Sequence, residues 1–258
     1  MSARPLPVWR RLRMARVLIE VCVDSAEGLA EAVAGGADRI ELCAALDVGG
    51  LTPSQGLMQA AAQCPVPVLA MIRPRSGDFV FSPAEVAIML ADIAAARAAG
   101  LAGVVMGSSR SDGRLDDAIL STLITAAAGL DLTLHRAFDL VPDVGAAIDL
   151  AVGLGFRRIL TSGQAATASE GRAGLERCFR IANGRLAILP GSGISAETVR
   201  ALRGLPLTEV HGSCSVPGRA APLGFGAPRR TSAARVRALK AALTEGEGGP
   251  NAQLSGNP

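Results

Sequence analysis

The chain has 258 residues, of which 49% are hydrophobic, 19% are charged and 3% are aromatic, and its formal net charge is +3. This length suits one large or two small globular domains with a substantial core. With no tyrosine, one tryptophan and only 26 basic against 23 acidic residues, the chain lacks the aromatic platform and the positive field that nucleic-acid binding needs.

The two ends of the chain differ in composition from its middle. Residues 1–16 carry several arginines around a short apolar stretch, and we expect a flexible basic arm there, because a signal peptide needs a longer apolar region. Residues 245–258 are rich in glycine and are expected to be a disordered tail. No apolar run approaches the roughly 18 to 20 residues of a membrane-spanning helix. We therefore expect a cytoplasmic protein that has neither a membrane nor nucleic acid as a partner.

Between these ends, in residues 17–244, short strand-like runs alternate with longer alanine-rich stretches. The eight predicted strands are 17–23, 39–42, 66–72, 103–106, 131–135, 158–161, 186–189 and 207–210. Eight such cycles indicate an α/β protein with a single-domain (β/α)8 TIM-like barrel. A doubly wound open sheet is the alternative, although no GxGxxG motif follows the first strand.

Polar residues indicate where the helices begin. Three pairs fit a capping residue followed three positions later by Glu or Gln: Asp24 with Glu27, Thr52 with Gln55, and Ser82 with Glu85. Glycines shortly before the next strand, such as Gly36 and Gly100, supply helix stops.

Alternation along the strands predicts which side chains face the barrel interior. In the first strand Glu20 and Cys22 share one face, and the aliphatic residues between them suit the helix side. The second strand repeats this with Glu41 and Cys43, and the eighth with Glu209 and His211. The candidate catalytic residues among the predicted inward polar groups are Glu20, Glu41, Arg73, His135 and His211. An ion-pair network that merely fills the barrel is the alternative for the glutamates.

Glycine and serine residues follow the seventh and eighth predicted strands, where barrels of this kind commonly hold phosphate. The predicted anion-binding residues are Gly191, Ser192, Gly193, Gly212 and Ser213.

The five cysteines form no CxxC pair, so a zinc knuckle or a disulfide framework is not indicated. Cys22 and Cys43 come from neighbouring strands, each two residues beyond a glutamate, and two thiolates at matched positions suit Cu(I). For Cys64 and Cys178 packing is the preferred interpretation. Cys214 is a candidate third soft donor.

Several segments together resemble one known family. They are GADRIELC, GGLTPS, RPRSGDF, LHRAFDL, ILTSGQ, GSGIS and EVHGSCS, and the resemblance as a whole extends from about Val17 to the helix after Pro228. This set is similar to the CutC family, named for copper homeostasis. The resemblance implies a TIM-like barrel, a cytoplasmic location and Cu(I) binding at Cys22 and Cys43. Arg75, Asp78, Arg136 and Asp139 also fall on motif positions of the family.

Two functions are therefore open, with copper or a small anionic metabolite as the ligand. The first is a copper homeostasis protein that binds Cu(I) at the barrel mouth. The second is an isomerase, epimerase or hydrolase acting on a phosphorylated or carboxylated compound, and a sensor that binds such a compound without turnover is a third. A Schiff-base mechanism is disfavoured because Lys240, the only lysine, lies in the last predicted helix. Since many barrels associate through their outer helices, a homodimer is one expectation.

Overall fold

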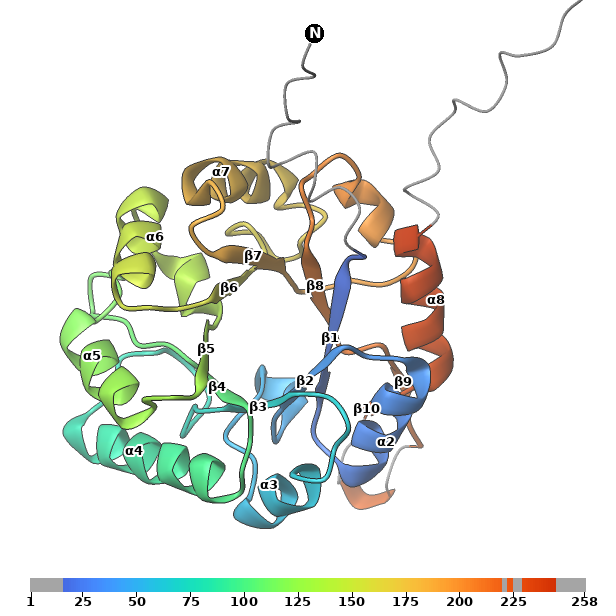
Figure 1. Ribbon diagram of the computed structural model, residues 1–258, viewed down its shortest axis with the longest axis horizontal. Helices are drawn as coiled ribbons and strands as arrows, with labels where there is room; N and C mark the ends of the chain where they lie inside the picture. Colours follow the sequence, from blue (N-terminus) through green and yellow to red (C-terminus); the bar gives the residue numbers. More distant parts are fainter. Residues whose placement is uncertain (1–15, 220–221, 225–228, 245–258) are drawn as a thin grey trace, which may run out of the picture.

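The computed structural model describes residues 16–219, 222–224 and 229–244, and the predicted basic arm, apart from Arg16, and the predicted tail lie outside these ranges. Within them, eight parallel strands form a ring that the helices surround (Figure 1). The strands are β1 (Leu18–Val23), β2 (Arg39–Leu42), β3 (Val68–Met71), β4 (Gly103–Met106), β5 (Asp131–Leu134), β6 (Arg158–Thr161), β7 (Ala187–Pro190) and β8 (Glu209–Gly212). The hydrogen-bonded order runs from β7 through β1 to β8, and β7 and β8 contact each other where the ring closes.

The helices follow the strands in alternation, which confirms the barrel and excludes the open sheet. They are α2 (Ala26–Gly35), α3 (Gln55–Ala61), α4 (Pro83–Ala98), α5 (Asp117–Ala126), α6 (Val144–Gly153), α7 (Arg172–Ala182) and α8 (Ala233–Thr244). Between β7 and β8 the described chain has a short 3₁₀ helix, Val199–Leu202, in place of an α-helix. No described helix is long and apolar enough to cross a membrane.

One of the three predicted helix caps is confirmed and two were wrong by a residue or two. Ser82 and Glu85 form the expected capping box, with Pro83 in the first turn. At the other two helices Ser25 and Ser54, rather than Asp24 and Thr52, accept the capping hydrogen bonds. The side chain of Asp24 accepts a hydrogen bond from the Leu46 amide instead. Where two polar residues lie one or two positions apart, the backbone conformation decides which one caps the helix.

The alternation in the strands separates an apolar layer from a polar interior. Ile19, Val21 and Val23 of β1 are fully buried in the large apolar cluster between the sheet and the helices. Glu20, on the opposite face, is also fully buried. Its register neighbours are Arg39 of β2 and His211 of β8. The inward parity predicted for these strands is therefore confirmed.

The last strand of the barrel is followed by a hairpin that the sequence patterns did not predict and then by the predicted last helix. After β8 a short antiparallel hairpin forms from β9 (Ser215–Pro217) and β10 (Arg229–Thr231). Helix α8 then packs against α2, so that the last helix of the described chain contacts the first (Figure 1). Across this contact Lys240 Nζ donates a hydrogen bond to the Gly36 carbonyl at 2.9 Å.

Candidate functional site

The interior beneath β8, β1 and β2 is a network of buried charges. Glu20 accepts a hydrogen bond from Arg39 Nε, and its other oxygen lies 2.8 Å from His211 Nδ1. Arg39 also donates to Glu209 at 2.6 Å. Each charge thus has an opposite partner, as buried charges require.

The network continues across the barrel to two residues that the sequence interpretation did not single out. Arg158 of β6 lies 3.5 Å from Glu209 and donates to Asp131 of β5 at 2.8 Å. It also donates to the hydroxyl of Thr133 at 2.9 Å. Asp131 is the first residue of β5 and Arg158 is the first residue of β6, and each has the parity of the inward face. That parity is the sequence signal that could have identified them.

Three side chains meet above this network. Cys22 Sγ, a carboxylate oxygen of Glu41 and a ring nitrogen of His211 lie within 4.8 Å of one another, and all three residues are buried. Since Glu20 contacts Nδ1 of His211, it is Nε2 that faces Glu41, at 3.7 Å from Oε2. The other oxygen of Glu41 has no hydrogen-bond partner among the described residues. These three residues, the Cys22 cluster, form a candidate metal centre.

The protonation of the cluster follows from its surroundings. Burial alone would raise the pKa of Glu20, but Arg39 and His211 outweigh it and lower that pKa to about 2. Burial disfavours the imidazolium of His211, yet Glu41, Cys22 and Glu20 together hold its pKa well above the usual range. Burial raises the pKa of Glu41. Glu20 is therefore a fixed carboxylate that orients the imidazole.

Cys43, predicted with Cys22 as a metal ligand, lies beside the Cys22 cluster and is not one of its three residues. It is fully buried and packs with Leu69, Met71 and Val105, and its thiol contacts Glu41 Oε2 at 3.5 Å. Burial, and then the charge of Glu41, raises the pKa of this thiol well above its usual value. The structure brings Cys22 together with Glu41 and His211, whereas Cys43 contacts only the Glu41 side of the cluster.

Of the remaining cysteines, Cys64 and Cys178 were predicted to be packing residues, and Cys214 was the candidate third soft donor. Burial raises the pKa of Cys214 to about 12 and that of Cys178 to about 11. Both are in the large apolar cluster, and Cys64 packs against it. Packing is the role that their positions indicate.

The ends of β3, β4 and β5 hold a second group of buried polar residues. The ring centroids of Phe79 and His135 are 4.7 Å apart. The guanidinium carbon of Arg73 lies 4.9 Å from the centroid of the Phe79 ring. Gly107 is required here, because a Cβ at that position would lie 2.5 Å from the imidazole of His135. Arg73 and His135 were both predicted as candidates, whereas Phe79 and Gly107 were missed.

At the predicted anion site, the serine and glycine residues form local turns and hydrogen bonds within the protein. Ser192 and Gly193 have φ values of 73° and 72°, and the Ser192 hydroxyl donates to the Ala166 carbonyl. The Gly193 carbonyl accepts from Thr198. Gly212 belongs to β8, and the hydroxyl of Ser213 bonds to that of Ser215. No α-helix begins at this loop in the described chain, so the helix N-terminus that commonly completes such a cradle is missing there.

Asp139 organises the loop after β6. It accepts hydrogen bonds from Arg136, Thr161, Ser162 and Gln164. This network explains two of the motif positions, Arg136 and Asp139, as supports of the barrel mouth.

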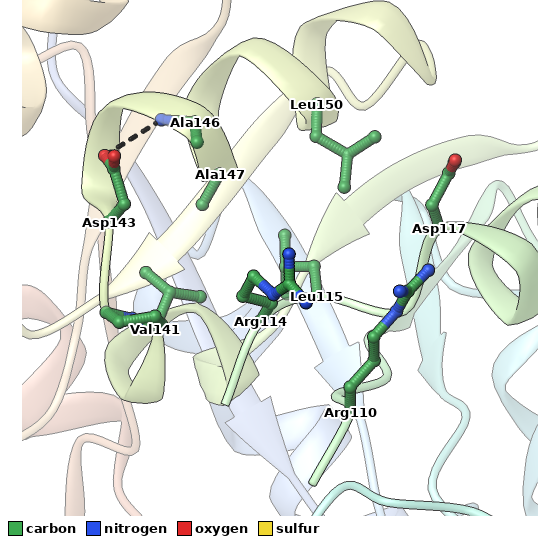
Figure 2. A pocket seen from close by; sticks show the side chains of 10 residues that line it. Arg110, Arg114, Leu115, Asp117, Val141, Asp143, Ala146, Ala147 and Leu150 are labelled. Carbon is green, nitrogen blue, oxygen red and sulfur yellow. Dashed lines mark hydrogen bonds between the residues drawn. The ribbon is translucent and has the colours of Figure 1, made fainter. Parts of the chain in front are cut away.

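A cavity of about 280 Å³ lies outside the ring, between the β4–α5 loop and α6. Figure 2 shows Arg110 and Arg114 across from Asp143, which caps α6 by accepting from the Ala146 amide. Arg114 already pairs with Asp112. The lining includes neither cysteine nor histidine.

The chain is similar to proteins of known families. A model of the CutC family matches residues 17–216. A relative from Sinorhizobium medicae, named family protein CutC, is 58% identical over 238 residues, which are 89% of this chain and 97% of the relative. The human copper homeostasis protein cutC homolog is 45% identical over 196 residues, 75% of this chain and 72% of the human protein.

The crystal structure of CutC from Streptococcus agalactiae superposes with a TM-score of 0.72 at 33% identity, covering 76% of this chain and 98% of that one. The names of these relatives give no support to the enzymatic alternative.

Proposed function

Because the chain belongs to the CutC family, we propose that it serves copper homeostasis by binding Cu(I) at Cys22, with His211 and Glu41 as the further ligands. The observation that carries this proposal is the convergence of three buried donor atoms within 4.8 Å. We place the protein in the cytoplasm, where cysteines remain reduced and available to a metal.

The donor set fits a soft or borderline cation. A thiolate and an imidazole are ligands that Cu(I) accepts readily, and Glu41 Oε1, buried without a partner, is a site where a cation would replace a missing hydrogen bond. Zn²⁺ also accepts sulfur, nitrogen and oxygen, so the two metals must be compared directly. Copper supplies no chemistry to a substrate in this proposal, because it is the cargo.

The residues around the cluster prepare it for the metal. Glu20 holds Nδ1 of His211, which leaves Nε2 to face Glu41. A metal requires the unprotonated imidazole nitrogen and the thiolate, so binding displaces protons from these groups. Cys43 contacts Oε2 of Glu41, the same oxygen that faces His211, and so positions that carboxylate.

The test is an anaerobic titration of the reduced protein with Cu(I) in competition with a chromophoric Cu(I) chelator, and a parallel titration with Zn²⁺. We expect one Cu(I) per chain in the wild type and loss of that stoichiometry in Cys22→Ser and in His211→Gln. Cys64→Ser is the matched control, because Cys64 lies outside the cluster.

Cys43→Ser decides how the second predicted thiolate acts. If Cys43 only positions Glu41, Cys43→Ser weakens Cu(I) binding by roughly 10- to 100-fold and keeps one metal per chain. If Cys43 is a ligand, the variant loses the metal as Cys22→Ser does. Unchanged Cu(I) stoichiometry in the double variant Cys22→Ser, Cys43→Ser would contradict the proposal. Preference for Zn²⁺ over Cu(I) would reassign the metal while keeping the site.

A further inference from the structure

Arg73 is a buried cation without an anion. The residue is 6% exposed, and no carboxylate of the described residues lies within ion-pair distance of it. Its guanidinium donates only to neutral carbonyls, those of Val48 at 3.0 Å, Gly50 at 3.2 Å and Gly77 at 2.8 Å. Burial, and then the charge of Arg75, lowers the pKa of Arg73. A buried charge ordinarily has an opposite partner, so this arrangement lacks one component.

The hydrogen-bond inventory shows where that component would bind. A guanidinium has five N–H donors, and the three carbonyls use two on Nη1 and one on Nη2. The Nε–H has no partner among the described residues, and one Nη2–H is also left. Nε and Nη2 form one edge of the planar fork, the edge that matches two oxygens of a carboxylate or a phosphate.

Arg75 provides the contrast within the same loop. It lies two residues further along and pairs with both Asp78 and Glu85. It also donates to the carbonyl of Val80. The half-buried arginine therefore has its carboxylates, and the buried one has none.

Two more buried donors belong to residues that, like Arg73, contact Phe79. His135 is 2% exposed, and its Nδ1 accepts from the Ala137 amide at 3.2 Å, so the neutral ring carries its proton on Nε2. That nitrogen has no partner among the described residues, and neither has the hydroxyl of Ser109, a residue 4% exposed. Phe79 joins the group, because its ring contacts Arg73 and His135 and its carbonyl accepts from the Ser109 amide at 2.8 Å.

We propose that the ends of β3, β4 and β5 form a binding site for the oxyanion group of a small carboxylate or phosphate compound, held by the Nε edge of Arg73, by His135 Nε2–H and by the Ser109 hydroxyl. The site is distinct from the Cys22 cluster, which lies on β8, β1 and β2. It is also distinct from the predicted cradle at Gly191, Ser192 and Gly193, where the serine hydroxyl is already used.

The experiment uses the metal-free protein labelled with ¹⁵N and follows the arginine Nε–H resonances. Inorganic phosphate and acetate are titrated separately at constant ionic strength, with chloride as the reference salt. Arg73→Lys assigns the Arg73 resonance by its disappearance. It also tests whether the Nε–Nη2 edge of the guanidinium binds the anion, because lysine keeps the charge and lacks that edge. We expect a saturable shift of the Arg73 resonance with at least one probe.

The variants separate binding from folding. We expect Arg73→Lys and His135→Gln each to weaken the anion roughly ten-fold or more, because each removes one donor to a charged group. Arg75→Lys, the matched control, leaves the affinity unchanged, and Cys22→Ser does so too, which keeps this test independent of copper. If Arg73→Lys fails to fold, His135→Gln and the wild-type titration still decide the outcome.

Each result has a stated meaning. A response to phosphate alone identifies a phosphorylated ligand, a response to acetate alone a carboxylated one, and both support the site. Absence of a saturable shift with either probe overturns the proposal, as does an affinity that Arg73→Lys and His135→Gln leave unchanged. Arg73 would then act only as a clamp for the two loops that supply its carbonyl partners.

Discussion

The barrel interior has two sectors that handle buried polarity in opposite ways. In the sector of β8, β1 and β2, Glu20 and Glu209 share Arg39, and His211 completes the pairing. In the sector of β3, β4 and β5, Arg73 has only carbonyl partners, and His135 and Ser109 each hold an unused donor. The first sector satisfies its charges internally, whereas the second has charge and donors left for a ligand.

The difference shows that burial alone does not identify a binding site. Glu20 and Arg73 are both buried, yet the loss of Glu20 would leave charged partners behind, whereas the loss of Arg73 would leave only neutral carbonyls. We therefore expect substitutions in the first sector to reduce stability and substitutions in the second to affect ligand binding more than stability.

The largest expected effect is that of Glu20→Gln. This change leaves Arg39 and His211 without the carboxylate between them, and we expect the free energy of unfolding to fall by about 3 to 5 kcal/mol. Urea denaturation measures it. Asp149→Asn, at an exposed ion pair with Arg185, is the control and should give a far smaller decrease. Equal losses in the two variants would remove the distinction between the sectors.

The second prediction concerns pH and His135. Burial, and then the charge of Arg73, lowers the pKa of His135 from 6.5 to about 3. Between these values the unfolded chain binds a proton that the folded chain does not, so stability is complete above pH 6.5 and decreases as the pH falls. The expected slope is about 1.4 kcal/mol per pH unit.

His135→Gln isolates this contribution. The difference in unfolding free energy between wild type and variant, measured from pH 7 to pH 5, should change by about 2 kcal/mol, because all other groups titrate in both proteins. Parallel stability curves would show that His135 is not held neutral by its surroundings.

A smaller effect is expected for Thr133→Val. The Thr133 hydroxyl accepts from Arg158 at 2.9 Å inside the paired network. Its removal should cost about 1 to 2 kcal/mol of unfolding free energy, measured by urea denaturation. A loss near zero would indicate that Arg158 is satisfied by its carboxylate partners alone.

The smallest effect, of opposite sign, is expected for Ser109→Ala. Its buried hydroxyl has no partner among the described residues, so its removal should leave the ligand-free protein unchanged or more stable by up to about 1 kcal/mol. The same measurement as for Thr133→Val applies. A clear loss of stability would place a hydrogen bond at Ser109 and weaken the contrast between the sectors.

The fold and the inward polar residues could be predicted because both follow from local periodicity. Alternation placed Glu20, Cys22, Glu41 and His211 inside, and the structure confirms each position. What alternation cannot supply is the stagger between strands. The register pairs Cys22 with Glu41 rather than with Cys43, so the two thiols that match in the sequence are offset along the barrel.

Other details depended on loops, where no period applies. Arg73 and Arg75 follow the end of β3, and nothing in their spacing distinguishes the buried residue from the paired one. The segment after Gly193 has a helix-capping serine in Ser195, whose hydroxyl accepts from the Thr198 amide, yet only a 3₁₀ helix follows. These outcomes depend on contacts between loops, which are distant in sequence.

The contact of Lys240 with Gly36 offers a chemical probe of how α8 packs against α2. An amine-reactive reagent meets only one side-chain amine in this chain, and that amine joins helix α8 to helix α2. Its rate of acylation under native conditions therefore reports how often α8 separates from α2. A fluorophore or cross-linker placed there would record the separation of these two helices without any engineered cysteine.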